Sequence, residues 1–250
     1  MTHFAILGGG RLARHMRHYF ALLGLPHSAW ARNPSPDLNT HGGIDSDRRL
    51  RKTLEPATHA LVLISDDAIP GFLTRHPALQ DKTVLHCSGT LSLPGIAGAH
   101  PLMTFGPGFY TLEEYRRIPF MVDSGHRFEH LLPGLPNPHF PIALEHKPRY
   151  HALCVMAGNF SQILWQGVTD RFADIGLPAT ALEPYLHRVV GNFTEHPETA
   201  LTGPLSRGDR GTIERNLQAL AGDNLQPVYQ AFLDHWNAET GSGRNTEVAS

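Results

Sequence analysis

The residues whose types and spacing best suit chemistry are the six at positions 8–13, GGGRLA, which directly follow a short apolar run. They fit the pattern G-x-G-x-x-A, in which Gly8 permits a tight turn, Gly10 lets a pyrophosphate approach the backbone, and Ala13 allows close helix-to-sheet packing. Phosphates would bind the N–H groups at the positive end of the helix. The pattern predicts a dinucleotide-binding turn formed by Gly8, Gly9, Gly10, Arg11 and Leu12. The alternative is a glycine turn that ends a strand for steric reasons alone.

The choice of dinucleotide is expected to depend on the end of the next strand, where the sequence reads WARNP. NAD-binding proteins usually present an acidic residue to the ribose hydroxyls at this point. Here Arg32 and Asn33 supply no carboxylate, and the planar guanidinium of Arg32 could pair with a 2′-phosphate. We therefore expect NADP(H) rather than NAD(H), unless Arg32 is an ordinary surface arginine.

The elements that must position these residues follow an alternation of short β-rich runs and helical patterns up to residue 145. This alternation predicts an α/β domain with a doubly wound parallel sheet. Strands are expected near residues 3–7, 27–31, 60–65, 83–87, 119–122 and 140–144, and the first helix at 11–23. Such sheets open toward a ligand where their strands end, so Ser65, Ser88 and Gly89 are expected to contact the cofactor.

Past Pro148 the pattern changes to long helical periods without strand alternation. We therefore expect a dinucleotide-binding domain at 1–145, an all-helical domain at 146–240 and a disordered tail at 241–250.

The composition of the 250-residue chain narrows the classes of function. A net charge of −2 gives no electrostatic case for nucleic acid or an anionic membrane. No charged leader or membrane-spanning apolar run is visible, so a cytoplasmic location is expected. Cys87 and Cys154 are expected to be reduced thiols, and the 17 histidines show no metal-ligand spacing, so no metal is expected.

Four further segments carry a family resemblance: HCSGTLS (86–92), HPLMTF (100–105), YHALCVMAGNF (150–160) and ALTGPLSRGDRGTIERNLQAL (200–220). With the glycine turn, they resemble a family of bacterial Rossmann-like oxidoreductases that have a C-terminal helical domain of unknown function. That family looks like a branch of the superfamily of ketopantoate reductase and pyrroline-5-carboxylate reductase. The resemblance implies a Rossmann domain, a helical domain like the C-terminal domain of 6-phosphogluconate dehydrogenases, homodimerisation through that domain, and reduction of a small carbonyl or imine.

One departure from the superfamily affects the expected proton donor. Many members carry a catalytic lysine four residues before an asparagine, whereas here Asn159 is preceded at that spacing by Val155. Lys147 would lie about 18 Å from Asn159 along a helix. At 100° per residue, His151 and Asn159 share a polar stripe with Gln162 and Gln166. Because His151 and Asn159 also stand at YH…N in the segment that carries the resemblance, the resemblance implies that these two are catalytic. The stripe could instead face water.

Two other places could contribute to the site. His100, in HPLMTF, could border the nicotinamide or be a turn histidine fixed by Pro101. The segment around Gly203 could bind a substrate carboxylate through Thr202 and Arg207, with Asp209 beside them. The alternative there is that Asp209 caps the next helix and pairs with Arg207 at the surface.

These expectations favour an NADPH-dependent reductase of a small 2-oxo acid, with ketopantoate as the leading candidate. Two alternatives stay open: a reductase of a cyclic imine such as pyrroline-5-carboxylate, and an NADP(H)-binding sensor without turnover, which the missing lysine makes credible.

Overall fold

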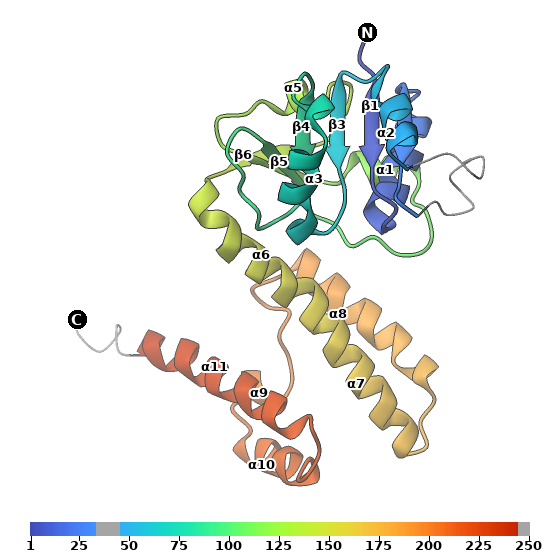
Figure 1. Ribbon diagram of the computed structural model, residues 1–250. Helices are drawn as coiled ribbons and strands as arrows, with labels where there is room; N and C mark the ends of the chain where they lie inside the picture. The colour runs from blue at the N-terminus through green and yellow to red at the C-terminus, as the bar shows by residue number, and fades with distance from the viewer. Residues whose placement is uncertain (34–45, 245–250) are drawn as a thin grey trace. The chain divides into compact units, whose positions relative to one another are not determined.

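The computed structural model in Figure 1 describes residues 1–33 and 46–244. The chain forms two compact units, Met1–Phe160 and Ser161–Ser250. Helix α6 (Lys147–Val155) belongs to the first unit, whereas the sequence assigns it to the helical domain that is expected from residue 146.

The first unit is built on a seven-stranded sheet with the strand order β2-β1-β3-β4-β5-β6-β7. The pairs from β2 to β5 are parallel, β6 is antiparallel to β5, and β7 is parallel to β6. The strands are β1 (Phe4–Leu7), β2 (His27–Trp30), β3 (His59–Val62), β4 (Thr83–His86), β5 (Ala97–Pro101), β6 (Phe120–Asp123) and β7 (His139–Ile142).

The sheet is mostly parallel, as predicted, and it differs from the prediction in the additional strand β5 and in the reversed direction of β6 and β7. Strand β5, with the sequence AGAHP, is missing from the prediction because it has no β-branched or aromatic residue. Its small side chains are nevertheless suited to a buried position, since Ala97 and Ala99 lie in the core.

Alternate residues of the central strands enter two separate cores, one on each face of the sheet. Phe4 and Ile6 of β1 pack in one core, and Ala5 and Leu7 pack in the other. Helices cover both faces (Figure 1), which is the doubly wound arrangement. These helices are α1 (Arg11–Leu22), α2 (Ser46–Leu54), α3 (Ile69–Arg75), α4 (Leu112–Arg116) and α5 (Phe128–Leu131), with 3₁₀ turns at Asp66–Ala68, Pro77–Leu79 and Leu144–His146.

Helix α1 follows the predicted pattern closely. Ala13, Met16, Tyr19 and Phe20 are buried at spacings of three, three and one. The helix ends at Leu22, and Gly24 follows with a positive φ of 67°. Glycine adopts this left-handed conformation at no steric cost.

The helix that begins with α6 contains a π-helical turn, Met156–Phe160, before α7 (Ser161–Asp174). A π turn has i→i+5 hydrogen bonds, so each of its residues advances by less than 100°. A uniform 100° per residue therefore does not describe the helix between His151 and Asn159, and their shared face stays a prediction. Asn159 lies within the π turn and is exposed.

The second unit is helical, as predicted. It contains α7, α8 (Glu183–Glu195), α9 (Pro204–Arg207), α10 (Arg210–Ala219), α11 (Gln226–Arg244) and a 3₁₀ turn at Ala179–Ala181. Helix α11 continues to Arg244, so positions 241–244 are helical rather than disordered, and 245–250 lie outside the described residues. None of the described helices is both long enough and apolar enough to cross a membrane.

Candidate functional site

The turn between β1 and α1 requires glycine at its first position. Gly8 has a φ of +154°, and a Cβ atom built on it would lie 2.1 Å from the carbonyl oxygen of Leu63. The Gly8 N–H donates to the carbonyl oxygen of Trp30 at 2.7 Å, which fixes the turn against β2. Gly8 is therefore explained by packing within the protein.

Gly10 is different, because no protein atom lies within 4 Å of the Cβ that could be built on it. It is the N-cap residue of α1 and has no side chain to cap the helix. The first N–H groups of an α-helix have no partner inside the helix. Packing thus does not demand glycine at this position, whereas a ligand approaching the helix end would need the open space.

A pocket of about 790 Å³ lies beside this turn, at the ends of β1, β2 and β3. Arg32 and Asn33 line it at the end of β2, and Ser65 lines it after β3. Trp30, Ile64 and Phe72 give the pocket an apolar surface, and the rings of Trp30 and Phe72 lie 5.6 Å apart. The remaining lining residues are Gly8, Gly9, Ala31, Ser46, Asp47, Ala68, Arg75 and His76.

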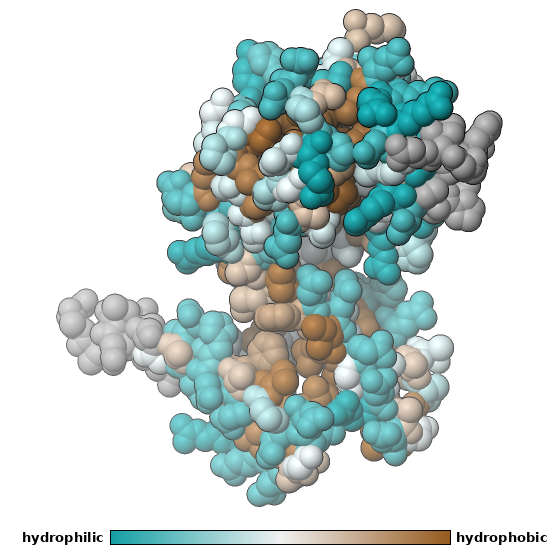
Figure 2. Space-filling model, in the orientation of Figure 1, coloured by the Kyte–Doolittle hydropathy of each residue, from teal (hydrophilic) through white to brown (hydrophobic). Residues whose placement is uncertain are grey.

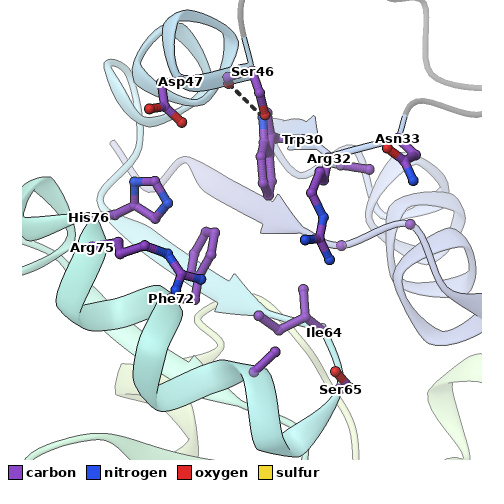
Figure 3. A pocket seen from close by; sticks show the side chains of 14 residues that line it. Trp30, Arg32, Asn33, Ser46, Asp47, Ile64, Ser65, Phe72, Arg75 and His76 are labelled. Atoms are coloured by element: carbon purple, nitrogen blue, oxygen red, sulfur yellow. Dashed lines mark hydrogen bonds between the residues drawn. The ribbon is translucent and has the colours of Figure 1, made fainter.

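Two basic residues of this pocket, Arg75 and His76, and the acidic Asp47 were missed from the sequence. Figure 3 shows Arg32 and Arg75 extending into the pocket from opposite sides, with His76 next to Arg75. Arg75 is the last residue of α3, where a basic side chain is usually explained by the helix dipole. That local explanation hides its position, because only the fold brings α3 beside β2.

A second pocket, of about 360 Å³, lies over the start of α1. It brings together nearly all of the remaining residues predicted to contact the cofactor. These are Gly9, Gly10, Arg11, Leu12, Ser65 and Ser88, and the pocket is also lined by Asp66 and Cys87.

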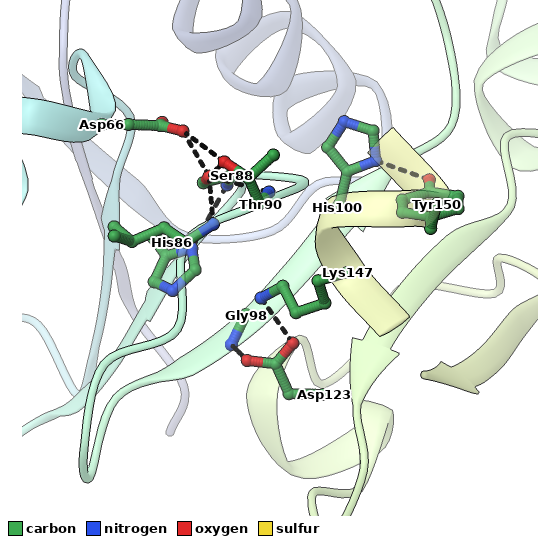
Figure 4. Close-up of polar contacts among 10 residues, drawn as sticks. Asp66, His86, Ser88, Thr90, Gly98, His100, Asp123, Lys147 and Tyr150 are labelled. Carbon is green, nitrogen blue, oxygen red and sulfur yellow. Dashed lines mark hydrogen bonds and ion pairs between the residues drawn. The ribbon is translucent and has the colours of Figure 1, made fainter. Parts of the chain in front are cut away.

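The hydroxyl of Ser88 is held by its own loop. It donates to the Asp66 carboxylate and accepts the N–H groups of Thr90 at 3.2 Å and Leu91 at 2.9 Å (Figure 4). Ser88 therefore orders the loop after β4 at the edge of the second pocket.

Cys87 is buried, and burial raises the pKa of its thiol to about 12. It is therefore a neutral thiol at physiological pH and no nucleophile, as expected from its position beside His86 on a strand. In the part of the chain that the structure describes, no group of three His, Cys, Asp or Glu residues could hold a metal.

Gly89, His100 and His151 meet although they come from three different elements. A Cβ atom on Gly89 would lie 2.4 Å from Cδ2 of His151 and 3.3 Å from Cδ2 of His100. The two imidazole rings lie 5.9 Å apart at 80°. Nδ1 of His100 is 2.7 Å from the hydroxyl of Tyr150, a residue that sequence reasoning missed.

The protonation state of His100 follows from its surroundings. Burial, the neighbouring His151 and the Lys147 ammonium lower the pKa of His100 to about 4. The ring is therefore neutral at physiological pH, so it carries one proton and one lone pair.

A buried ion pair fixes α6 to the sheet beside these residues. Nζ of Lys147 lies 2.7 Å from Oδ1 of Asp123, and Oδ2 of Asp123 accepts the N–H of Gly98 at 2.7 Å (Figure 4). A Cβ atom on Gly98 would lie 2.7 Å from both charged groups, so glycine is needed for this approach. Lys147 is therefore engaged in anchoring α6, consistent with the expectation that it does not replace the missing lysine.

His86 is a further buried polar side chain close to the ion pair. Its Nδ1 accepts the N–H of Ser88 at 3.2 Å, while Nε2 has no partner among the described residues. Burial and Lys147 lower the pKa of His86, so the ring is neutral.

The residues predicted to bind a carboxylate lie in the second unit. Asp209 caps α10, because its carboxylate accepts hydrogen bonds from the Thr212 N–H at 3.1 Å and from the Thr212 hydroxyl at 2.8 Å. These bonds lower the pKa of Asp209 and support the capping alternative. Thr202 and Arg207 are exposed, and Arg207 lines a pocket of about 680 Å³ with Arg210 and Trp236. Their role toward a substrate stays a prediction.

Together, the strand order, the glycine turn and the two pockets define the class of fold. It is a Rossmann-type α/β domain followed by an all-helical unit. Residues 124–235 match the model of a domain of unknown function, DUF2520. No curated protein matches the chain in sequence.

Solved structures resemble the chain over almost its whole length. An NADP oxidoreductase, so named provisionally, from Bacteroides fragilis has 19% identity, covers 95% of this chain and 98% of its own, and has a TM-score of 0.70. Protein TM1727 from Thermotoga maritima has 24% identity, coverages of 98% and 100%, and a TM-score of 0.65. Pyrroline carboxylate reductase from Plasmodium falciparum, solved with NADP bound, has 11% identity, coverages of 97% and 97%, and a TM-score of 0.59. These similarities confirm the predicted fold.

Proposed function

We propose that the protein is an NADP(H)-dependent reductase. The observation that carries this proposal is the open Gly10 position at the start of α1 beside a pocket that contains Arg32. A purely structural glycine turn explains Gly8 but leaves Gly10 without a reason. An anionic ligand on the helix end explains both Gly10 and the nearby guanidinium groups.

The residues present fit an NADP molecule. Gly9, Gly10, Arg11 and Leu12 would bind the pyrophosphate through their backbone, and Arg32, Asn33 and Arg75 would surround the adenosine with its 2′-phosphate. Ser65, Ser88 and Gly89 would border the rest of the cofactor. When bound, the cofactor supplies the hydride, and the protein supplies orientation and a proton.

The substrate we propose is a small 2-oxo acid, with ketopantoate first. Reduction of a carbonyl places negative charge on its oxygen, so the site needs hydrogen-bond donors there. His100 and His151 are the donors that the first unit brings together beside Gly89. Asn159 stays a proposed catalytic residue, Thr202 and Arg207 stay proposed carboxylate-binding residues of the second unit, and Asp209 is engaged as the cap of α10.

A cyclic imine is the second candidate substrate. It is supported by the structural resemblance to a pyrroline carboxylate reductase and to an imine reductase from Streptomyces aurantiacus. We further propose that the protein acts in the cytoplasm as a homodimer joined by its helical unit.

The test is a substrate screen that follows NADPH absorbance, together with calorimetric titration of NADP(H) and NAD(H). Oxidation of NADPH with ketopantoate or another 2-oxo acid supports the first candidate, and oxidation with pyrroline-5-carboxylate alone supports the second. Tight NADPH binding without turnover across the whole panel would replace the reductase with a sensor. Failure to bind either dinucleotide would refute both readings.

A further inference from the structure

Tyr150 and His100 form a close hydrogen bond between α6 and β5. The phenol oxygen lies 2.7 Å from Nδ1 of His100, and the two rings are nearly perpendicular, at 80°. Figure 4 shows the hydroxyl of Tyr150 directed at one nitrogen of His100, while the other nitrogen points away from it.

The direction of this bond follows from the available donors and acceptors. Burial and a hydrogen bond with Cys154 raise the pKa of Tyr150, so the phenol keeps its proton. Its single O–H can be donated to Nδ1 of His100 or to the sulfur of Cys154. An imidazole lone pair is a much better acceptor than a thiol sulfur. The phenol proton is therefore donated to Nδ1, and the weakly donating thiol faces the phenol oxygen.

This bond determines which nitrogen of His100 carries the ring proton. The groups that face the ring are Tyr150 and His151 from α6, the Lys147 ammonium, and the more distant Asp66 carboxylate after β3. Together with burial they keep the ring neutral at physiological pH. A neutral ring whose Nδ1 accepts a proton must carry its own proton on Nε2.

The rings of His100 and His151 both pack against Gly89, and the Nε2 side of His100 faces it. Cδ2, the atom bonded to Nε2, lies 3.3 Å from the position that a Cβ of Gly89 would occupy, and Cδ2 of His151 lies 2.4 Å from it. Nε2 of His100 makes no hydrogen bond to the described residues. It is not among the buried side-chain atoms that lack a partner, so it is accessible from outside the protein core.

We propose that Tyr150 is a positioning residue, whose hydroxyl holds His100 as the Nε2–H tautomer and aims that N–H at a substrate oxygen next to Gly89. The inference rests on the proposed reductase function for the identity of the oxygen, which would belong to a carbonyl or carboxylate group. Lys147 and Asp123 support the arrangement, because their ion pair anchors α6 one turn before Tyr150 and His151. Tyr150 would thus act on the reaction only through His100.

The first test measures the tautomer directly. Protein labelled with ¹⁵N in its histidines is studied by NMR at pH 7.5 without cofactor or substrate, and His100→Gln identifies the His100 signals by their loss. The expected spectrum has a protonated Nε2 and an unprotonated, hydrogen-bonded Nδ1. In Tyr150→Phe the Nδ1 resonance should move while the other histidines stay in place. A proton on Nδ1 in the wild-type protein overturns the proposal.

Tyr115→Phe is the matched control, because the Tyr115 hydroxyl makes the same contact, at 2.7 Å, with Nδ1 of a different histidine, His15. It should move the His15 signals and leave those of His100 unchanged. If both variants move His100 equally, the effect of Tyr150→Phe is a general change of structure and the proposal fails.

The second test uses turnover with whichever substrate the screen identifies. Tyr150→Phe should lower kcat about ten- to a hundredfold, part of what a positioned proton donor contributes, with KM and the Kd for NADPH changed less than about threefold. Tyr229→Phe, whose hydroxyl contacts Asn216 in the second unit, should have no effect. Unchanged kcat in Tyr150→Phe refutes the positioning role while leaving the reductase function intact. Absence of any turnover refutes the reductase function, and the NMR result still decides the tautomer.

Discussion

At the scale of single residues, the candidate site depends on side chains whose partners are distant in sequence. His100 and Tyr150 are 50 residues apart, and Lys147 and Asp123 are 24 apart. Motifs could indicate His100 and His151 because they stand in recognisable segments. Tyr150 stands in the same segment as His151, but nothing local indicates its contact with His100, which comes from the approach of α6 to β5. The role of Arg75 likewise comes from the approach of α3 to β2.

We expect Arg32 and Arg75, which line the pocket of about 790 Å³, to determine the preference between the two dinucleotides. Arg32→Ala should weaken NADP(H) binding about ten- to a hundredfold, because a charge-assisted bidentate contact is worth roughly 1.5–3 kcal/mol. Arg75→Ala should act in the same direction, and NAD(H) affinity should change little in either variant. Calorimetric titration measures this, with the exposed Arg117→Ala as control. An unchanged preference would remove that arginine from the recognition of the 2′-phosphate.

Stability should depend on pH through the buried histidines. The pKa of His100 falls from 6.5 to about 4 on folding, and that of His86 is also lowered. Between these values the unfolded chain binds more protons than the folded one. The free energy of unfolding is therefore highest above pH 6.5 with respect to these histidines. It decreases as the pH falls toward 4, by up to about 1.4 kcal/mol per pH unit for each such proton.

Urea denaturation at several pH values checks this dependence. His100→Gln should give a shallower slope between pH 6.5 and 4 than the wild-type protein, and the exposed His126→Gln should not. Equal slopes in all three proteins would mean that folding does not lower the pKa of His100.

At the scale of elements, the sequence predicts β1, α1, β2, β3 and β4 closely, because each has a clear apolar period and a glycine or proline at its end. Strand β5 has no such pattern, and its register is decided by its neighbours. The π turn after α6 is equally hidden, since it changes the direction of side chains without changing the helical composition. The residues that depend on the glycine turn could thus be predicted, whereas strand β5, which carries His100, and the π turn, which carries Asn159, could not.

The two outer glycines of the β1–α1 turn should separate folding from binding. Gly8→Ala should lower the free energy of unfolding by at least about 2 kcal/mol, because the side chain meets the Leu63 carbonyl and φ is positive. Gly10→Ala should change it by less than about 1 kcal/mol but weaken NADPH binding about tenfold or more. Urea denaturation and calorimetry measure the two effects. Normal NADPH affinity in Gly10→Ala would contradict a phosphate site on this helix.

The attachment of α6 to the sheet should depend on both partners of its ion pair. Lys147→Met leaves Asp123 buried and unpaired, at a cost of about 3–5 kcal/mol. Lys147→Met combined with Asp123→Asn removes both charges and keeps an acceptor for the Gly98 N–H, so it should be more stable than Lys147→Met alone. A double-mutant cycle from denaturation curves measures this coupling. Purely additive effects would show that the pair does not hold α6.

At the scale of the whole molecule, the helical unit exposes several large apolar side chains, and Figure 2 shows hydrophobic residues on it. On α8, Tyr185 is 64% exposed, Val189 43% and Phe193 62%, and their spacing of four residues places them on one face. On α7, Ile163 is 68% exposed, whereas Leu164, Trp165 and Phe172 are half-buried. These exposed residues support the proposed homodimer interface.

Light scattering at micromolar concentration should therefore give twice the chain mass of 27.6 kDa. Val189→Glu combined with Phe193→Glu should shift the protein toward the monomer, because a symmetric interface would bury each charge twice. Glu substitutions at the exposed, polar positions Gln162 and Gln166 are the control. A monomer mass for the wild-type protein would exclude the homodimer under these conditions.

The reversal of strand direction at β6 has a consequence for how the chain reaches the site. Strands β1 to β5 all run toward the edge of the sheet where the glycine turn lies, whereas β6 and β7 run the opposite way. The chain therefore leaves β7 at the end of the sheet opposite the glycine turn, and α6 runs back along β5. Lys147 lies beside Gly98, and Tyr150 lies beside His100, two residues further along the strand. In a wholly parallel sheet of the same length, the chain would leave its last strand at the ligand edge and this helix would lead away from it. The reversed direction of β6 and β7 thus lets α6 run back toward the carboxyl ends of β1 to β5, where the glycine turn lies.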